Sequence, residues 1–214
     1  MPVRARTRRV VRKHVPSDER RRQILAVAAD LFGQRGYAGT TTKQIAAAVG
    51  TSETVLFRLF PTKETLYAAI LEQRVPVAEV ERWLQELRKI ADRRDDEALV
   101  TAFVRAALRS YRTDITYHRL MLFAALESHE LARLCQVKYS SPVAGFLREY
   151  VSRRQAEGAF KPLRPELVVH MLFSVVGQFA MWNALGMNLF GLTEQDVESQ
   201  AIALLAGLRT DTKK

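Results

Sequence analysis

Residues 41–61 contain several helix-start and helix-stop signals, and these signals constrain the fold more than any other feature of the chain. Thr41 is followed three residues later by Gln44, the spacing of a capping box that begins a helix. Gly50 is a typical helix stop, and Ser52 can cap a second start directly after it. Two short helices joined at a glycine predict a helix-turn-helix.

The second of these helices has an ambiguous composition. Residues 54–60 read TVLFRLF, a β-branched and aromatic run that could also form a buried strand. Pro61 follows at once, and a residue before proline is pushed out of the α region, so a helix would end near Phe60. In a helix, Leu56, Leu59 and Phe60 share one face. We therefore interpret the segment as a short helix.

Helical periodicity extends over nearly all of the remaining chain. Ser17 begins a helix that Gly36 ends, and no convincing strand pair or hairpin turn appears. The sequence predicts an all-α fold of about nine helices. Beyond the helix-turn-helix, these are expected at 17–36, 62–90 with a bend at Pro76, 96–112, 116–127, 129–156, 165–187 and 194–209, with a charged loop at 91–97.

The net charge of +10 is concentrated at the N-terminus. Residues 1–22 hold nine Arg or Lys against two acids, which accounts for +7, while the remainder is nearly neutral. Such asymmetry indicates a polyanionic partner at that end, nucleic acid or an anionic membrane, unless the run is a solvated tail. The segment lacks the Trp, Phe and Leu face of an interfacial helix, which disfavours the membrane.

Composition limits compartment and chemistry. Cys135 is the only cysteine, and no secretory signal is apparent, so a reducing cytoplasm is expected. The most apolar run, residues 167–182, is interrupted by three polar residues and is interpreted as a core helix that falls short of spanning a membrane. His118, His129 and His170 are too scattered for a helical metal pair, and no nucleotide-binding or nucleophile motif occurs, so we expect no metal, no cofactor and no enzymatic activity.

One fifty-residue stretch resembles a known family. The matching positions are Leu31 and Phe32, Gly36 and Tyr37, Thr40 and Thr41, Ile45 and Ala46, Gly50, Ser52, residues 56–60, and Lys63 with Glu64. With these, residues 23–71 resemble the DNA-binding domain of the tetracycline-repressor (TetR) family of bacterial transcription regulators. The resemblance covers about a quarter of the chain by motif.

The resemblance implies a domain organisation and a partner. Residues 1–16 would be a basic arm, 17–75 a DNA-binding domain with its helix-turn-helix at about 41–60, and 76–214 a ligand-binding and dimerisation domain. A homodimer would place two reading helices roughly 34–36 Å apart on a palindromic operator. Thr41 and Lys63 match family phosphate contacts. The DNA-contact candidates are Thr41, Thr42, Lys43, Ser52, Glu53, Thr54, Phe57, Arg58 and Lys63, with Arg8, Arg9 and Arg12 of the arm.

The reading helix departs from the family pattern. Phe57 stands where a phosphate-binding tyrosine is common, Leu59 where a histidine is common, and Glu53 where a lysine is common. Arg58 is either a base-edge or phosphate contact or a solvated charge, and Ser52 and Thr54 either cap the helix or touch DNA. Because phosphate neutralisation dominates affinity, we hypothesise that the arm compensates, on the phosphates or in an adjacent minor groove.

The larger domain is expected to hold an effector. Its aromatic and methionine residues are either core or the wall of an apolar pocket for a small, largely apolar molecule. The candidate lining residues are Phe103, Tyr117, His118, Met121, Phe173, Gln178 and Trp182. Small residues on the last two long helices suit an intersubunit four-helix bundle, as the resemblance implies, and the dimerisation candidates are Gly177, Ala180, Ala184, Ala201, Leu204, Leu205 and Leu208.

The expected function is a ligand-responsive repressor that an effector releases from its operator by favouring a wider spacing of the two heads. The competing interpretation is an all-α small-molecule-binding protein or enzyme with a vestigial DNA-binding head.

Overall fold

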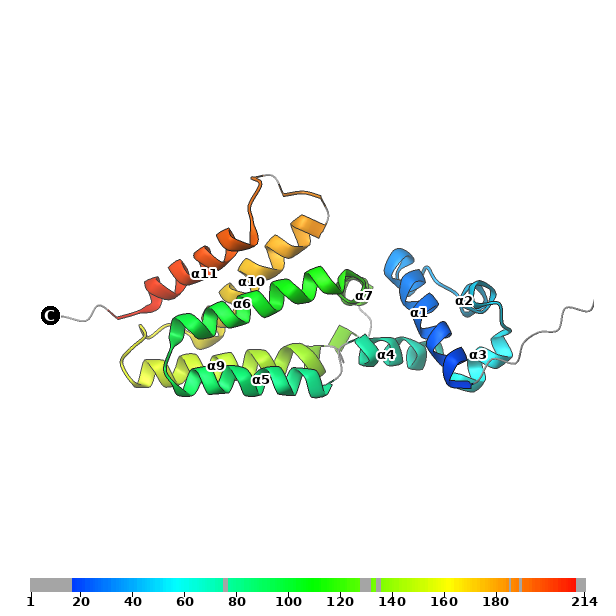
Figure 1. The fold of residues 1–214 in the computed structure, drawn as a ribbon, viewed down its shortest axis with the longest axis horizontal. Helices are drawn as coiled ribbons and strands as arrows, with labels where there is room; N and C mark the ends of the chain where they lie inside the picture. Colours follow the sequence, from blue (N-terminus) through cyan, green and yellow to red (C-terminus); the bar gives the residue numbers. More distant parts are fainter. Residues whose placement is uncertain are drawn as a thin grey trace, which may run out of the picture.

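The computed structural model describes residues 17–74, 77–127, 132–133, 136–184, 186–188 and 190–210. These residues form an all-α protein, and the predicted fold class is confirmed. The elements are α1 (Ser17–Arg35), α2 (Thr42–Val49), α3 (Glu53–Leu59), α4 (Lys63–Arg74), α5 (Val77–Asp92), α6 (Asp96–Thr113), α7 (Ile115–Leu126), a π-helical segment (Gln136–Ser140), α9 (Ser141–Ala156), α10 (Pro165–Ala184) and α11 (Glu194–Leu208). Helices α1–α3 form a head at one end of an elongated body (Figure 1).

The helix-turn-helix forms where local signals predict it. Thr41 and Gln44 make both bonds of the capping box, and Gly50 ends α2 in the left-handed conformation with φ of 73°. The Ser52 hydroxyl then accepts the N–H of Val55 to begin α3. Residues 54–60 are therefore a helix and not a strand, and α3 ends at Leu59 with Phe60 as its extended C-cap.

The head has a compact apolar core that fixes α3 to α1 and α4. Leu56 and Phe60 are buried in it beside Phe32 of α1 and Leu66 and Tyr67 of α4. Burying side chains of this size stabilises a fold by roughly 1.5–3 kcal/mol each. Hence the apolar half of TVLFRLF is structural, as its helical face predicts.

Two arginines of α1 support the ends of α2 and α3. Arg20 donates to the carbonyl of Val49 at 3.3 Å, and Arg21 donates to the carbonyl of Leu59 at 3.4 Å while its guanidinium lies 4.5 Å from the Phe60 ring centroid. Both carbonyls lie at helix C-termini, where a cation is favourable. The sequence pattern assigns these arginines to the basic run, whereas in the fold they pack the head together.

The body is built around α6. This helix contacts α5, α7, α10 and α11, and α9 packs against α10 and α5. Figure 1 shows α5, α6 and α9 running along the long axis, with α10 and α11 beside them and the last turn of α11 at the end remote from the head. Leu99, Phe103, Val104 and Leu108 form the buried stripe of α6.

Several predicted boundaries need correction. Helix α5 continues to Asp92 and α6 begins at Asp96, so the charged loop expected at 91–97 shrinks to three residues because Asp95 caps α6. The helix expected at 129–156 is described as a π-helical segment followed by α9, and α10 ends at Ala184 instead of residue 187. The expected bend at Pro76 lies outside the described residues, as do His129 and Cys135.

Helix α10 is shorter than the expected 165–187, but it is still long and apolar. Among the described residues it is one helix whose length and composition would allow it to cross a membrane, so the expectation that this run falls short is wrong on those two criteria. Val168, Val169, Leu172, Val176 and Ala180 are nevertheless buried against the rest of the subunit. The predicted role as a core helix agrees with that burial.

Candidate functional site

The outward face of α3 carries three neighbouring exposed side chains. Thr54 and Arg58 are exposed, and Phe57 is 42% exposed. None of the three contributes to the buried core, because the opposite face of α3 supplies Leu56. Sequence reasoning singled out all three, and their exposure leaves base-edge or phosphate contact available to them.

Thr42 and Glu53 contact each other. The Thr42 hydroxyl donates to the Glu53 carboxylate at 2.6 Å, which links the first turn of α2 to the first turn of α3. Glu53 also lies at the positive N-terminal end of α3, where a carboxylate is favourable. Both residues were DNA-contact candidates, and in this structure their side chains hold the two helices of the motif in register.

Lys63 is turned inward. Its ammonium group donates to the carbonyl of Tyr37 and lies 4.0 Å from the Tyr37 ring centroid. Burial lowers the pKa of Lys63, opposed by the nearby Glu127 and Glu64 carboxylates. Its phosphate contact stays a prediction, and the side chain would have to leave these partners to make it.

The remaining polar candidates of the head lie on its surface. Thr41 and Ser52 are exposed and cap α2 and α3 through their hydroxyls, and Lys43 is exposed on α2. Arg8, Arg9 and Arg12 lie outside the described residues.

A cavity of about 1160 Å³ lies in the body between α5, α6, α7, α9 and α10. Five of the predicted lining residues border it: Phe103, Tyr117, His118, Met121 and Phe173. Gln178 and Trp182 do not line it and are exposed on the outer side of α10, so their assignment is corrected. Met181, Gly177 and Tyr111 take part in the wall instead.

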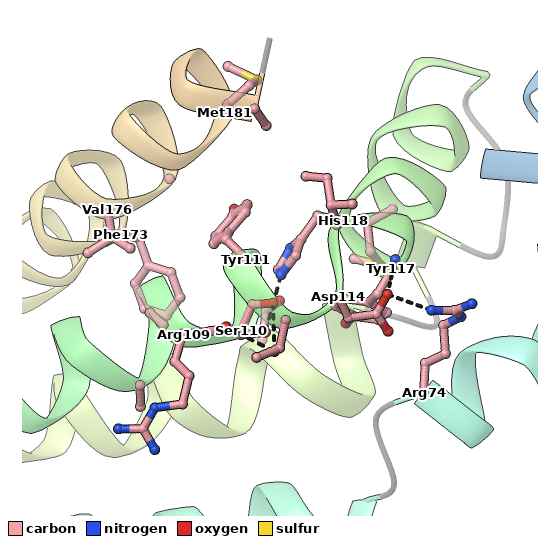
Figure 2. Close-up of a pocket in the computed structure, with 18 of the residues that line it drawn as sticks. Arg74, Arg109, Ser110, Tyr111, Asp114, Tyr117, His118, Phe173, Val176 and Met181 are labelled. Atoms are coloured by element: carbon pink, nitrogen blue, oxygen red, sulfur yellow. Dashed lines mark hydrogen bonds and ion pairs between the residues drawn. The ribbon is translucent and has the colours of Figure 1, made fainter. Parts of the chain in front are cut away.

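A stacked pair of rings forms one part of the cavity wall. The Tyr111 and His118 rings lie 3.6 Å apart with an interplanar angle of 11°, and the His118 Nε2 is 3.2 Å from the Ser110 hydroxyl. Burial lowers the pKa of His118 to about 4, so the imidazole is neutral at pH 7. Figure 2 shows this pair between α10, with Phe173 and Met181, and the ion pair of Arg74 with Asp114.

That ion pair connects the cavity with the end of α4. Arg74 donates to the Asp114 carboxylate at 2.5 Å, and the same carboxylate caps α7 by accepting the N–H of Tyr117 at 3.0 Å. Arg74 is the last residue of α4, the helix that follows the head, and both residues line the cavity. A molecule that displaces either side chain would therefore act on the start of α7 and the end of α4 together.

Helix α7 reaches from the cavity to the head. Its first turns supply Tyr117 and His118 to the cavity, and its backbone carbonyl at Leu120 accepts the buried hydroxyl of Tyr67 at 2.7 Å. At its C-terminal end Glu127 accepts the N–H of Ala38, in the turn between α1 and α2, at 3.1 Å. Figure 1 shows α7 at the junction of head and body.

Glycines allow this close approach. Gly36 has φ of 74°, and a Cβ built there would lie 2.3 Å from Glu127 Oε1 and 3.2 Å from the Phe123 ring. A Cβ at Gly33 would lie 3.2 Å from the Thr116 methyl group. The two glycines therefore bring α1 and α7 together, a role that the sequence pattern of Gly36 as a helix stop does not reveal.

Most of the dimerisation candidates point into their own subunit. Ala180, Ala201, Leu205 and Leu208 are buried within the chain, Leu204 is half-buried, and Gly177 borders the cavity. Side chains covered by their own subunit offer little surface to a second copy, so these four contribute mainly to the core of the subunit, and their role in dimerisation stays a prediction. The exposed row on α10 consists of Leu167, Met171, Ser174, Gln178 and Trp182, and Ala184 is exposed nearby.

No group of three or more His, Cys, Asp or Glu side chains suited to a metal ion occurs among the residues that the structure describes. The expected absence of a metal is left as an expectation.

The fold and site together define a class of protein. A helix-turn-helix head with an exposed reading face is joined, through α4 and α7, to a helical body that encloses a cavity, the architecture of a DNA-binding transcription regulator. The sequence model described as "Bacterial regulatory proteins, tetR family" matches residues 24–70. The head of this chain is therefore similar to the DNA-binding domain of the TetR family, as its motif predicts.

Curated relatives and a solved structure agree with this assignment. The HTH-type transcriptional regulator RutR of Escherichia coli (strain K12) is 26% identical over 168 residues, 75% of this chain and 74% of that protein. The HTH-type transcriptional activator FasR of Mycolicibacterium smegmatis is 39% identical over 90 residues, 42% of this chain and 41% of that protein. AibR, solved in complex with isovaleryl coenzyme A and operator DNA, superposes with a TM-score of 0.65 at 22% identity, covering 87% of this chain and 97% of that one.

Proposed function

We propose that this protein is a transcriptional repressor that binds a palindromic operator as a dimer and is released by a small, largely apolar effector held in the body cavity. The observation that carries the proposal is the double role of α7, which lines the cavity at His118 and caps the head at Ala38 through Glu127. One helix thus connects effector and head. The expected domain boundaries, near residues 16 and 75, are consistent with this division.

On the DNA side, the exposed face of α3 supports contact by Thr54, Phe57 and Arg58. Arg58 is suited to a bidentate contact with guanine, and the Phe57 ring to a thymine methyl group or the sugar wall. Arg20 and Arg21 support α2 and α3, so phosphate neutralisation falls to Lys43, to the arginines of residues 1–13, and to Lys63 once its ammonium leaves Tyr37. The arm then supplies affinity and α3 supplies sequence preference.

On the effector side, the size and lining of the cavity support a small molecule. Its volume exceeds the roughly 300–1,000 Å³ common for ligand sites, and aliphatic, aromatic and methionine side chains together make up most of its wall. An effector can shift the head only by its differential affinity for two arrangements of α7 and α4, typically about 1–3 kcal/mol. AibR and its isovaleryl coenzyme A complex illustrate a related fold with bound ligand and DNA.

For the dimer, we propose that the outward row of α10 meets its counterpart in a second copy. Leu167, Met171 and Trp182 are 50%, 36% and 36% exposed, a degree that is unusual for one helix of a monomer. Helix α11 offers the small exposed residues Ala203, Ala206 and Gly207 beside it. An isologous contact of this kind would give the two-fold axis that a palindrome requires.

A cytoplasmic location and the lack of catalytic activity complete the proposal. RutR is named a transcriptional regulator and FasR a transcriptional activator, and repression by this chain is our own inference.

A gel-shift assay with the DNA upstream of the chain's own gene tests the proposal. We expect salt-dependent binding to one palindrome, loss of preference by roughly 1–3 kcal/mol for Arg58→Ala, and, for a chain lacking residues 1–13, a salt slope flatter by about 0.9 for each lost phosphate contact. Lys89→Ala, an exposed change in the body, is the control. Equal binding to any DNA, or to none, overturns the proposal, and an unchanged slope overturns the role of the arm.

A further inference from the structure

We propose that the body cavity takes an amphipathic anion, a molecule with an apolar chain or ring body that ends in a carboxylate. This inference deepens the proposed function and rests on it. It follows from the distribution of charge, hydrogen-bond donors and apolar surface around the cavity wall.

The acidic residues of the wall are already paired. Asp114 accepts from Arg74 at 2.5 Å and from the N–H of Tyr117 at 3.0 Å. Glu79 has Arg82 at 3.7 Å, one turn further along α5. A cationic ligand would have to compete with these arginines for the carboxylates, so the wall does not favour one.

Two arginines of the cavity wall carry a positive charge that no nearby carboxylate among the described residues neutralises. Arg109 of α6 and Arg119 of α7 border the cavity, and within the described part of the chain neither lies in ion-pair distance of a carboxylate. Both are exposed, which keeps their guanidinium groups hydrated until a ligand arrives. In Figure 2 the Arg109 guanidinium lies away from the pair of Arg74 and Asp114. The uncompensated charge of the wall is therefore positive.

The uncharged polar groups also favour an acceptor. Tyr111 and Ser140 border the cavity and carry hydroxyl groups that can donate beside the two arginines, whereas the Thr113 hydroxyl already donates to the carbonyl of Arg109 at 2.9 Å and the Ser110 hydroxyl is 3.2 Å from His118 Nε2. Burial raises the pKa of Tyr111, so its hydroxyl stays protonated and can donate. His118 is neutral at pH 7 because burial lowers its pKa to about 4, and it adds no charge of its own. A carboxylate can accept several of these donors at once.

The apolar part of the cavity wall would contact the apolar chain or ring of the ligand. Trp83 and Phe103 stack with centroids 6.1 Å apart, and Phe103 meets Phe173 at 5.2 Å. Val143 and Val176 extend this surface from α9 and α10. The area is continuous enough to cover an alkyl chain or an aromatic body, whose transfer from water supplies the affinity.

The experiment uses the full-length Trp182→Phe variant, in which Trp83 is the remaining tryptophan and reports on the cavity. Its fluorescence is titrated at pH 7.5 with decanoate, decan-1-ol and decyltrimethylammonium, three probes of equal chain length that differ in charge, below their micelle concentrations. We expect decanoate to bind about tenfold more tightly than decan-1-ol, and the ammonium probe more weakly than either. In Arg109→Gln/Arg119→Gln the decanoate Kd should rise to that of decan-1-ol, whose own Kd stays unchanged.

The control variant is Arg148→Gln, an exposed arginine on α9 outside the cavity wall, which should keep the preference for decanoate. The proposal is overturned if the alcohol or the cation binds as tightly as decanoate, if the double variant keeps the preference, or if no probe binds. Operator binding without any probe is measured separately by gel shift. If the probes show no preference for the anion, the proposed DNA-binding function is unaffected. If operator binding is absent, the charge preference of the cavity is still decided by the titrations.

Discussion

Glu127 accepts a hydrogen bond from the backbone N–H of Ala38 at 3.1 Å, across 89 residues of sequence. The bond ties the end of a cavity-lining helix to the turn that positions α2 and, through α2, the reading helix. Because Glu127 also follows Phe123 on the side of α7 that faces Gly36, one short stretch of α7 fixes the head against the body.

Replacing Glu127 by alanine should release this turn. The Ala38 N–H loses its acceptor, so we expect the free energy of unfolding to fall by about 1 kcal/mol and amide exchange in residues 36–40 to speed up about fivefold or more. Urea denaturation and hydrogen exchange by mass spectrometry measure both effects. Glu149→Ala, at an exposed site on α9, is the matched control. Unchanged exchange in the turn would contradict the role given to Glu127.

Two glycines share the left-handed backbone conformation but differ in their surroundings, so replacing each by alanine distinguishes the cost of a steric clash from the cost of backbone strain. Gly36 and Gly50 have φ of 74° and 73°, but an added Cβ meets Glu127 and Phe123 at Gly36 and nothing within 4 Å at Gly50. Gly50→Ala should cost about 1–2 kcal/mol, the penalty of the left-handed region, and lower Tm by about 2–8 °C. Gly36→Ala should lower the free energy of unfolding by clearly more than Gly50→Ala, because the added methyl group also meets Glu127 and Phe123.

A double variant tests the origin of that excess. If the added methyl group acts by displacing the Glu127 carboxylate, Gly36→Ala with Glu127→Ala should cost less than the sum of the two single changes. Strict additivity would show that the excess comes from Phe123 or from the backbone alone.

His118 makes stability depend on pH in a defined window. Its pKa is about 4 in the folded chain, against about 6.5 when unfolded, so between these values the unfolded state binds more protons. Stability should therefore fall as pH decreases from 6.5 to 4, by up to about 1.4 kcal/mol per pH unit from this group. We expect His118→Gln to show a flatter profile than the parent chain in urea titrations at pH 7.5, 6 and 5. Parallel profiles would contradict the burial of the neutral imidazole.

The outward row of α10 predicts the effect of a charge at Trp182. In an apolar contact between two copies, Trp182→Glu would place like charges together near the two-fold axis, so we expect the dimer Kd to rise by about 100-fold or more. Sedimentation velocity over a range of concentrations measures the dimer. Leu126→Glu, which is 71% exposed on α7, should leave the association unchanged. A dimer unaffected by Trp182→Glu would place the contact elsewhere.

Local signals made the head predictable. The capping box at Thr41, the stop at Gly50 and the cap at Ser52 each act over three or four residues, and all three form as expected. The buried face of α3 follows from the same periodicity. The cavity was predicted in part, because large apolar side chains on neighbouring helices have few alternatives to a shared interior, and five of seven lining residues are found there.

Contacts between residues far apart in the chain could not be predicted from the sequence. The Glu127–Ala38 bond, the inward turn of Lys63 and the support of α2 and α3 by Arg20 and Arg21 depend on the packing of helices far apart in the chain. The burial of several dimerisation candidates on α10 and α11 was unforeseen for a similar reason. Small residues such as Ala180 and Ala201 allow close helix packing, but their spacing does not tell contact within a subunit from contact between subunits.

The exposure of Thr54, Phe57 and Arg58 has an evolutionary consequence. These side chains contribute nothing to the buried core of the head, whose residues on α3 are Leu56 and its cap Phe60. Mutations at the three positions can therefore accumulate at little cost to folding, and one ancestral scaffold could be redirected from gene to gene by drift at three codons. Because folding and DNA contact use different side chains of α3, the head is a practical starting point for selecting DNA-binding regulators with new targets.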